Sequence, residues 1–189
     1  MNQSELIKQL TPKEIRKALY MSQLLFFSLG IILSLFFFPS FFQWTTLFKW
    51  DIKQIILLGI APALIIVILE IVLYAFVPKK HFEDGGMNEK VFKNTTTLQV
   101  AWIALIVAIC EEILFRGFVQ TIFGYIFASS LFAVIHYRYL TKPLLFILLV
   151  MISFLIGYLF EISGNLLVTI SFHFVVDFLL GVYISKVAK

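Results

Sequence analysis

The chain has 189 residues, of which 61% are hydrophobic and 14% are charged, and its net charge is +4. Soluble domains are about a quarter charged, so a chain of this composition cannot cover a water-facing surface. One cysteine excludes an internal disulfide, and the length leaves no room for a second large domain.

The polar N-terminal segment, residues 1–19, contains a helix-start signal. Thr11 is the predicted N-cap, Pro12 the first helical residue and Glu14 the reciprocal partner in a capping box. Apolar residues are spaced along this segment. We expect either a short amphipathic helix lying at the membrane surface or a solvated tail.

Six apolar runs follow, and each is a candidate transmembrane helix because a crossing needs about 20 apolar residues. The fourth run is short and is separated from the third by Gly124. Pro62 lies inside the second run, where we expect a kink. The predicted fold class is therefore an all-α polytopic membrane bundle of about six transmembrane helices. The runs are 21–38, 54–77, 98–123, 126–141, 143–160 and 165–185.

The distribution of positive charge predicts the orientation of the chain. With the N-terminus inside, twelve of the 15 Lys and Arg residues fall in inside segments. Lys49 and Lys53 lie in an outside loop, and Arg116 lies within a span. This bias predicts cytoplasmic N- and C-termini in a multi-pass protein of the cell membrane. The basic residues thus set orientation in the lipid bilayer, and we expect no nucleic-acid partner. The inside loop 78–97 is expected to be a mobile connector.

Several ionisable residues lie inside the predicted spans, where charge is costly and function is the default hypothesis. Four of them lie roughly 12–18 Å from the outer ends of three spans, so they reach a similar depth. These four are Glu111, His136, His173 and Asp177. For Glu70 on the second span, the sequence leaves three roles open: pairing within the bundle, lining substrate access, or snorkelling.

Spacing assigns partners to these residues. Glu112 and Arg116 are four apart, so they share a helix face and can neutralise each other. Glu111 is turned about 100° away from Glu112 and should point elsewhere. His173 and Asp177 are also four apart and share a face.

A carboxyl group and two histidines in one buried pocket are sufficient for amide hydrolysis by activated water. The carboxylate can take a proton from water near neutral pH, and a neighbouring histidine can orient the same water. A second histidine with a hydrogen-bonding partner can donate to a developing oxyanion. No covalent intermediate is needed.

At these residues the chain resembles the CAAX protease and bacteriocin-processing family, also called the Abi or type II CAAX prenyl endopeptidase-like family. The first motif, E-E-x-x-x-R, is residues 111–116; the second, F-x-x-x-H, is 132–136; the third, H-x-x-x-N/D, is 173–177. The resemblance covers 98–185, which we interpret as a catalytic core of four spans. Residues 1–97 are expected to hold the N-terminal helix, two spans and a cytoplasmic loop.

The resemblance implies a metal-independent intramembrane glutamic endopeptidase that hydrolyses a membrane-associated peptide or protein, in bacteriocin self-immunity or in peptide maturation. It implies no cofactor. By the same resemblance, Glu111 and His136 activate the water, and His173 and Asp177 stabilise the oxyanion. The residues expected to support them structurally are Glu112, Arg116 and Phe132, the last by bracing His136.

The family often has Asn where this chain has Asp177. Asp177 donates a hydrogen bond only when it is protonated. Otherwise it would accept from His173 and fix the tautomer of that ring. Both roles stay open at this point.

Three other functions fit the sequence. The protein could be a non-proteolytic membrane immunity or scaffold protein that binds a membrane partner. It could be a proton-coupled transporter, although no inverted repeat is evident. It could also be a zinc enzyme with Glu and two His as ligands, although no H-E-x-x-H motif is present.

Overall fold

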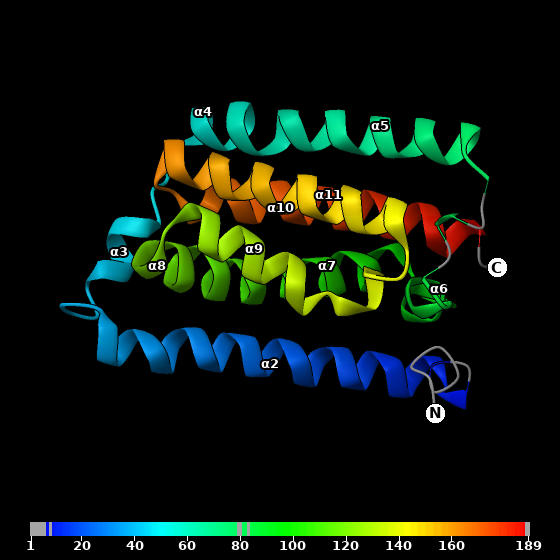
Figure 1. Cartoon of the computed structure of the whole chain (residues 1–189), viewed down its shortest axis with the longest axis horizontal. Helices are drawn as coiled ribbons and strands as arrows, with labels where there is room; N and C mark the ends of the chain where they lie inside the picture. Colours follow the sequence, from blue (N-terminus) through cyan, green and yellow to red (C-terminus); the bar gives the residue numbers. More distant parts are fainter. Residues whose placement is uncertain (1–6, 8, 79–80, 83, 188–189) are drawn as a thin grey trace.

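The computed structural model describes residues 7, 9–78, 81–82 and 84–187, and this part of the chain contains helices and no strands. The all-α fold class is therefore confirmed. Figure 1 shows the long helices running side by side along one axis. The long helices are α2 (Pro12–Phe37), α5 (Ala61–Phe76), α7 (Thr97–Glu112), α10 (Pro143–Ser163) and α11 (Leu166–Val187).

Shorter elements extend or connect the long ones. Ile52–Phe76 is one unbroken span built from α4, η1 and α5, and Thr97–Phe123 is another, built from α7, η3 and α8. The short elements are α3 (Gln43–Leu47), α4 (Ile52–Gln54), η1 (Ile55–Ile60), α6 (Met87–Phe92), η3 (Ile113–Gln120), α8 (Thr121–Phe123), α9 (Tyr125–Ile135) and η4 (Tyr137–Tyr139).

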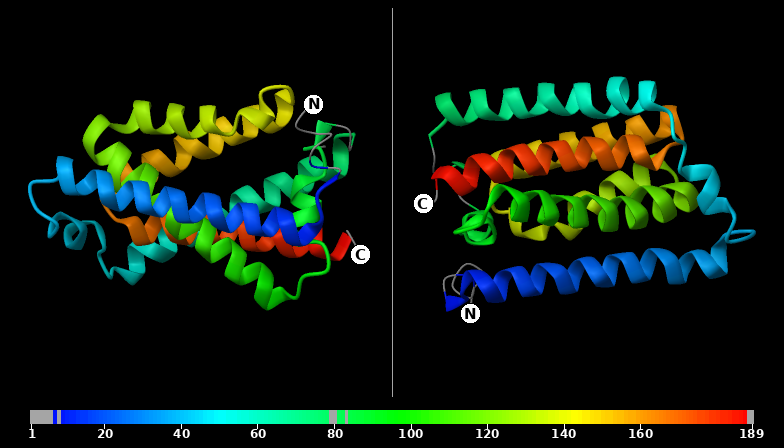
Figure 2. Two further views of the ribbon diagram at one scale, coloured as in Figure 1. Left: turned by 90° about the horizontal axis from the view of Figure 1, so that it is seen from below. Right: turned by 180° about the vertical axis from the view of Figure 1, so that it is seen from behind.

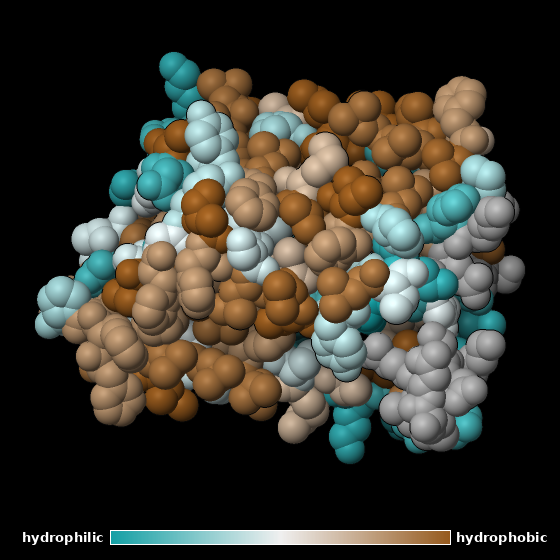
Figure 3. Space-filling model, in the orientation of Figure 1, coloured by the Kyte–Doolittle hydropathy of each residue, from teal (hydrophilic) through white to brown (hydrophobic). Residues whose placement is uncertain are grey.

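Five helices in the described part of the chain are long and apolar enough to cross a membrane. Many of their large apolar side chains are exposed, as lipid-facing side chains must be. In Figure 3 most of one face is hydrophobic, and hydrophilic residues gather toward the two ends. The chain is therefore a multi-pass membrane protein. The five spans are Pro12–Phe37, Ile52–Phe76, Thr97–Phe123, Pro143–Ser163 and Leu166–Val187.

The first span begins earlier than the sequence suggested. The predicted capping box is present: the Thr11 N–H donates to Glu14 Oε2 at 2.8 Å, and the Glu14 N–H donates to Thr11 Oγ1 at 3.3 Å. From this cap, α2 continues without a break to Phe37. A separate surface helix or tail is therefore wrong for residues 12–19, because nothing after the cap interrupts the helix. Residues 1–6 and 8 lie outside the described residues.

The helix is irregular next to Pro62, where the sequence predicted a kink. Residues Ile55–Ile60 form π-helical turns just before the proline, and the Ala61 N–H donates to the Ile56 carbonyl, five residues back. Because proline has no N–H and its ring crowds the preceding turn, a wider turn accommodates it within a continuous span. The helix type thus changes at the position where the sequence predicted a kink, and the kink itself stays a prediction.

The fourth predicted span, 126–141, is shorter than expected. Helix α9 has 11 residues and ends at Ile135, and a 3₁₀ turn follows at Tyr137–Tyr139. The start of α2 and the end of α11 lie at the same end of the bundle (Figure 1). This arrangement supports an even number of crossings, with α9 as the short one. Six spans and cytoplasmic termini stay predictions.

The predicted connector 78–97 contains a packed helix, α6. The N-cap of α6 is Gly86, whose φ of 82° lies in the left-handed region that glycine tolerates. Lys90 Nζ donates to the Leu10 carbonyl at 2.8 Å, and Arg16 Nη1 donates to the Val91 carbonyl at 3.2 Å. These bonds hold α6 against the start of α2.

The span that carries the first motif lies at the centre of the bundle. Of its most apolar stretch, 61% is buried, against 17% for the α2 span. Helix α7 packs against α11 and α2, and η3 packs against α2 and α9. In the right-hand view of Figure 2, α7 lies between α11 and α2. The motif residues are therefore shielded from lipid.

Gly59 allows η1 and α11 to approach closely. A Cβ at this position would lie 2.8 Å from the Val168 carbonyl oxygen, which is main chain and cannot move aside. We expect Gly59→Val to lower the free energy of unfolding by about 1–3 kcal/mol, measured by unfolding of the detergent-purified protein. Leu57→Ala is the control, since Leu57 is 56% exposed, and it should cost less than about 0.5 kcal/mol. Equal stability of the two variants would contradict this packing.

Candidate active site

The first motif lies where the helix type changes. Glu111 and Glu112 are the last two residues of α7, and the π-helical segment η3 begins at Ile113. π-helical turns inside α-helices frequently occur at functional sites. Both carboxyl groups are buried, in the most enclosed span of the bundle.

Glu112 is the hub of a buried polar network. Its Oε1 accepts from Arg116 Nη1 at 3.2 Å and from His173 Nδ1 at 2.9 Å. The side chains of Glu112 and Arg116 are both 0% exposed. Arg116 Nη2 also donates to the Ser153 carbonyl at 3.0 Å, which ties α10 to the network. The predicted Glu112–Arg116 pair is therefore confirmed, and it has a histidine as third member.

Glu111 points away from Arg116, as its position on the helix predicted. Its Oε1 accepts from Gln23 Nε2 at 3.0 Å. Its Oε2 lies 4.0 Å from His173 Nε2. The two adjacent carboxyl groups thus differ in their hydrogen-bond donors: Glu112 accepts from a guanidinium and from His173, whereas Glu111 accepts from a neutral amide and lies farther from the His173 ring.

His173 lies between three carboxyl groups. Nδ1 contacts Glu112, and Nε2 lies 3.5 Å from Asp177 Oδ2 and 4.0 Å from Glu111 Oε2. A carboxylate only accepts hydrogen bonds, so Nδ1 carries the proton in its bond to Glu112. The tautomer of His173 is therefore fixed by Glu112, a role that the sequence had offered to Asp177.

His136 follows directly after the end of α9. Its Nδ1 donates to the Phe132 carbonyl at 2.8 Å, because a carbonyl oxygen can only accept. In the neutral ring, Nε2 is then the basic nitrogen. The Phe132 ring lies 4.7 Å from the His136 ring and 4.7 Å from the Arg116 guanidinium carbon. Phe132 thus contacts both His136 and the buried ion pair.

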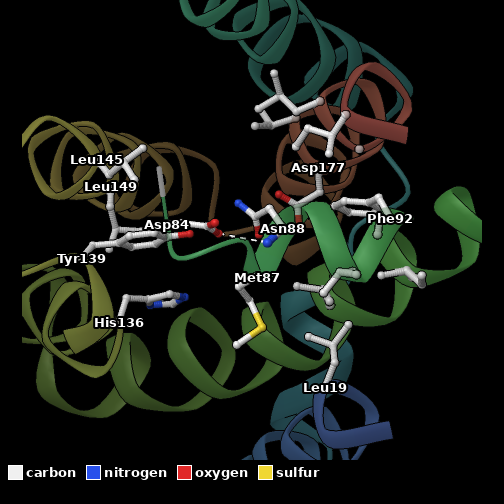
Figure 4. Close-up of a pocket in the computed structure, with 18 of the residues that line it drawn as sticks. Leu19, Asp84, Met87, Asn88, Phe92, His136, Tyr139, Leu145, Leu149 and Asp177 are labelled. Carbon is white, nitrogen blue, oxygen red and sulfur yellow. Dashed lines mark hydrogen bonds between the residues drawn. The ribbon is translucent and has the colours of Figure 1, made fainter. Parts of the chain in front are cut away.

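One cavity of about 980 Å³ brings the predicted site residues together. Glu111, His136, His173 and Asp177 all line it. Much of its remaining wall is apolar and comes from α2, α7, α10 and α11. Figure 4 shows His136 and Asp177 in this pocket, with side chains of α6 seen between them. The three motifs therefore share one partly polar cavity.

Sequence reasoning missed several residues of this cavity. Gln23 on α2 contacts Glu111, and Asp84, Met87 and Asn88 line the cavity from the segment that begins α6. A lone amide inside an apolar run was the available signal for Gln23, whereas nothing local marked the other three. Glu70 also lines the cavity, which agrees with the role of lining substrate access that the sequence left open.

A zinc site needs three or four ligand side chains grouped around one point. Among the residues that the structure describes, no three His, Cys, Asp or Glu side chains are grouped so as to hold a metal ion. A zinc-dependent reaction stays a hypothesis for experiment.

The buried network predicts a stability effect that is distinct from catalysis. We expect Glu112→Gln to lower the free energy of unfolding by about 3–5 kcal/mol, because it leaves the Arg116 charge buried without a compensating anion. The double variant Glu112→Gln with Arg116→Met should regain much of this loss. The free energy of unfolding in detergent is measured for each single variant, Glu112→Gln and Arg116→Met, and for the double variant, which completes a double-mutant cycle. Single variants as stable as the wild type would contradict a buried ion pair.

Comparison with known proteins gives two matches. The family model described as "Type II CAAX prenyl endopeptidase Rce1-like" matches residues 93–179, a range that includes all three motifs. Uncharacterized protein YpbD of Bacillus subtilis (strain 168) is 38% identical over 159 residues, which are 83% of this chain and 83% of the relative. No solved structure matches the chain. The chain therefore belongs to the type II CAAX prenyl endopeptidase Rce1-like family, which indicates a membrane endopeptidase of the CAAX protease type.

Proposed function

We propose that the protein is an intramembrane glutamic endopeptidase that hydrolyses a peptide bond of a membrane-associated peptide or protein without a metal ion. The observation that carries the proposal is the arrangement around Glu111. Its Oε2 faces His173 in the same cavity that His136 and Asp177 line. A carboxyl group and two imidazoles thus adjoin a space that can hold a peptide and a water molecule.

The proposed reaction begins with water bound between Glu111 and His136. Glu111 takes one proton as the water oxygen attacks the carbonyl carbon of the substrate, and His136 Nε2 orients the water. The peptide C–N bond then breaks, and the proton on Glu111 passes to the departing nitrogen. The products are a carboxylic acid and an amine, with no covalent enzyme intermediate.

The oxyanion of the tetrahedral intermediate needs hydrogen-bond donors. His173 can supply one when both ring nitrogens are protonated, because Nδ1–H is held by Glu112 and Nε2–H then points toward Glu111 and Asp177. A protonated Asp177 can supply a second. The negative charge of Glu112 supports the imidazolium form of His173 across a 2.9 Å contact.

The cavity supports a substrate that arrives from the membrane. Its volume of about 980 Å³ accommodates a short extended segment of chain, and its apolar walls suit hydrophobic side chains or a lipid-like group. We place the reaction at the cell membrane. By resemblance to the family, the proposed pathway is peptide maturation or bacteriocin self-immunity.

The direct test replaces the proposed base. We expect Glu111→Gln to slow cleavage at least roughly 10²–10⁴-fold, because the amide cannot take a proton from water. The substrate is sought by comparing the membrane and secreted proteomes of three strains: wild type, deletion and Glu111→Gln. Uncut precursors should accumulate equally in the last two. Glu161→Gln, which changes an exposed carboxyl of α10, is the matched control and should process normally.

The same comparison separates the enzyme from a non-proteolytic protein. If the Glu111→Gln strain processed every precursor as the wild type does, or kept any immunity phenotype in full, a membrane immunity or scaffold function would replace the protease.

Metal independence is tested on membranes that contain the wild-type protein and a precursor found in this way. Strong chelators of zinc should leave the cleavage rate within about twofold, because proton transfer to Glu111 requires no Lewis acid. A known zinc protease assayed in parallel confirms that the chelator is effective. Loss of cleavage that added zinc restores would favour the zinc enzyme.

A further inference from the structure

Gln23 is a buried polar residue of α2 that reaches the proposed catalytic base. Its side chain is 2% exposed and lies in the wall of the cavity. Nε2 donates to Glu111 Oε1 at 3.0 Å across 88 residues of sequence. Gln23 lies outside the range 93–179 that the family model matches. The family match therefore does not account for this contact.

The two adjacent carboxyl groups differ in the charge of their partners. Glu112 contacts the Arg116 guanidinium and His173, and a carboxylate neutralised in this way is a poor proton acceptor. Glu111 accepts its hydrogen bond from an amide, which carries no charge, and its nearest imidazole nitrogen, His173 Nε2, is 4.0 Å away. An amide can fix the orientation of a carboxylate while leaving its negative charge available for a proton.

The contact also differentiates the two oxygens of Glu111. Oε1 is occupied by Gln23, and Oε2 is the oxygen on the His173 side. A carboxyl group held at one oxygen presents the other in a fixed direction, which is the geometry that proton abstraction needs.

The second polar atom of Gln23 is buried as well. Its Oε1 accepts no hydrogen bond from any described residue, and an unmade buried hydrogen bond is costly. Both polar atoms of Gln23 therefore lie inside the protein, and the one side-chain hydrogen bond that Gln23 makes is directed at the proposed base.

We propose that Gln23 is a positioning residue for the hydrolysis: it holds Glu111 Oε1 so that Oε2 receives the proton from water. This inference rests on the proposed function. The competing interpretation is that Gln23 only links α2 to α7, since amide side chains often join helices inside membranes.

The test uses a near-isosteric variant, Gln23→Met, which keeps side-chain length and removes the donor. We expect processing of the identified precursor to slow roughly tenfold to hundredfold at equal protein abundance, as for loss of a hydrogen bond to a charged group. Assays on isolated membranes should place the loss in kcat, with KM nearly unchanged. Gln23→His, which retains an N–H donor at similar reach, should recover much of the rate.

Gln120→Met is the matched control. Gln120 is also a buried glutamine, 4% exposed, and its Nε2 bonds the Gly157 carbonyl and Glu161 instead of the site. The Gln120→Met variant should process the precursor at the wild-type rate. A second readout needs no substrate: the infrared carboxylate band of Glu111, obtained as the difference between wild type and Glu111→Gln, should shift in Gln23→Met and stay in place in Gln120→Met.

Each outcome bears on a different claim. Normal processing by Glu111→Gln, or no precursor that depends on the protein, overturns the proposed function and the role of Gln23 with it. If Glu111→Gln is inactive but Gln23→Met processes at full rate or changes KM alone, the role of Gln23 is wrong and the protease stands. An unshifted infrared band in Gln23→Met, or an equal loss in Gln120→Met, also overturns the positioning role.

Discussion

The fold around the site depends on one carboxylate, that of Glu112. A single oxygen of this group accepts from Arg116 on the same span and from His173 on α11, and Arg116 continues to the main chain of α10. Three helices are thereby tied together at a fully buried point. Such a network tolerates no missing member, because each unpaired charge would remain in a medium that cannot solvate it.

The same network explains how two neighbouring glutamates can have unrelated chemistry. Glu112 is neutralised in place and orients His173, whereas Glu111, about 100° further round the helix, reaches an amide and a cavity. The ring of His173 then lies between the buried ion pair and the proposed catalytic base. Adjacent residues that face different partners thus carry the ion pair and the proposed reactivity.

The sequence predicted the parts of this arrangement that are local. The all-α class and the Glu112–Arg116 pair follow from composition and from four-residue spacing on one helix, and both are confirmed. The contacts of His173 with Glu112 and of Gln23 with Glu111 join segments 61 and 88 residues apart. Their geometry depends on how whole helices pack, which no local pattern records. The early start of α2 was missed because a polar first turn resembles a surface helix. The early end of α9 was missed because Tyr137, Tyr139 and Leu140 resemble a continuation of the span past His136, despite Arg138.

The length of α9 has a consequence for the surrounding lipid. Eleven residues rise only about 16 Å, whereas the hydrocarbon layer is about 30 Å thick. In the predicted six-span arrangement α9 is one of the crossings, and a crossing this short requires the bilayer to thin around it. The main chain after α9 keeps its own hydrogen bonds, since the Tyr139 N–H donates to the His136 carbonyl at 2.9 Å within η4. Under that prediction, thinning brings headgroups and water toward His136, and the shortest crossing gives polar reactants a short path to the cavity that His136 lines.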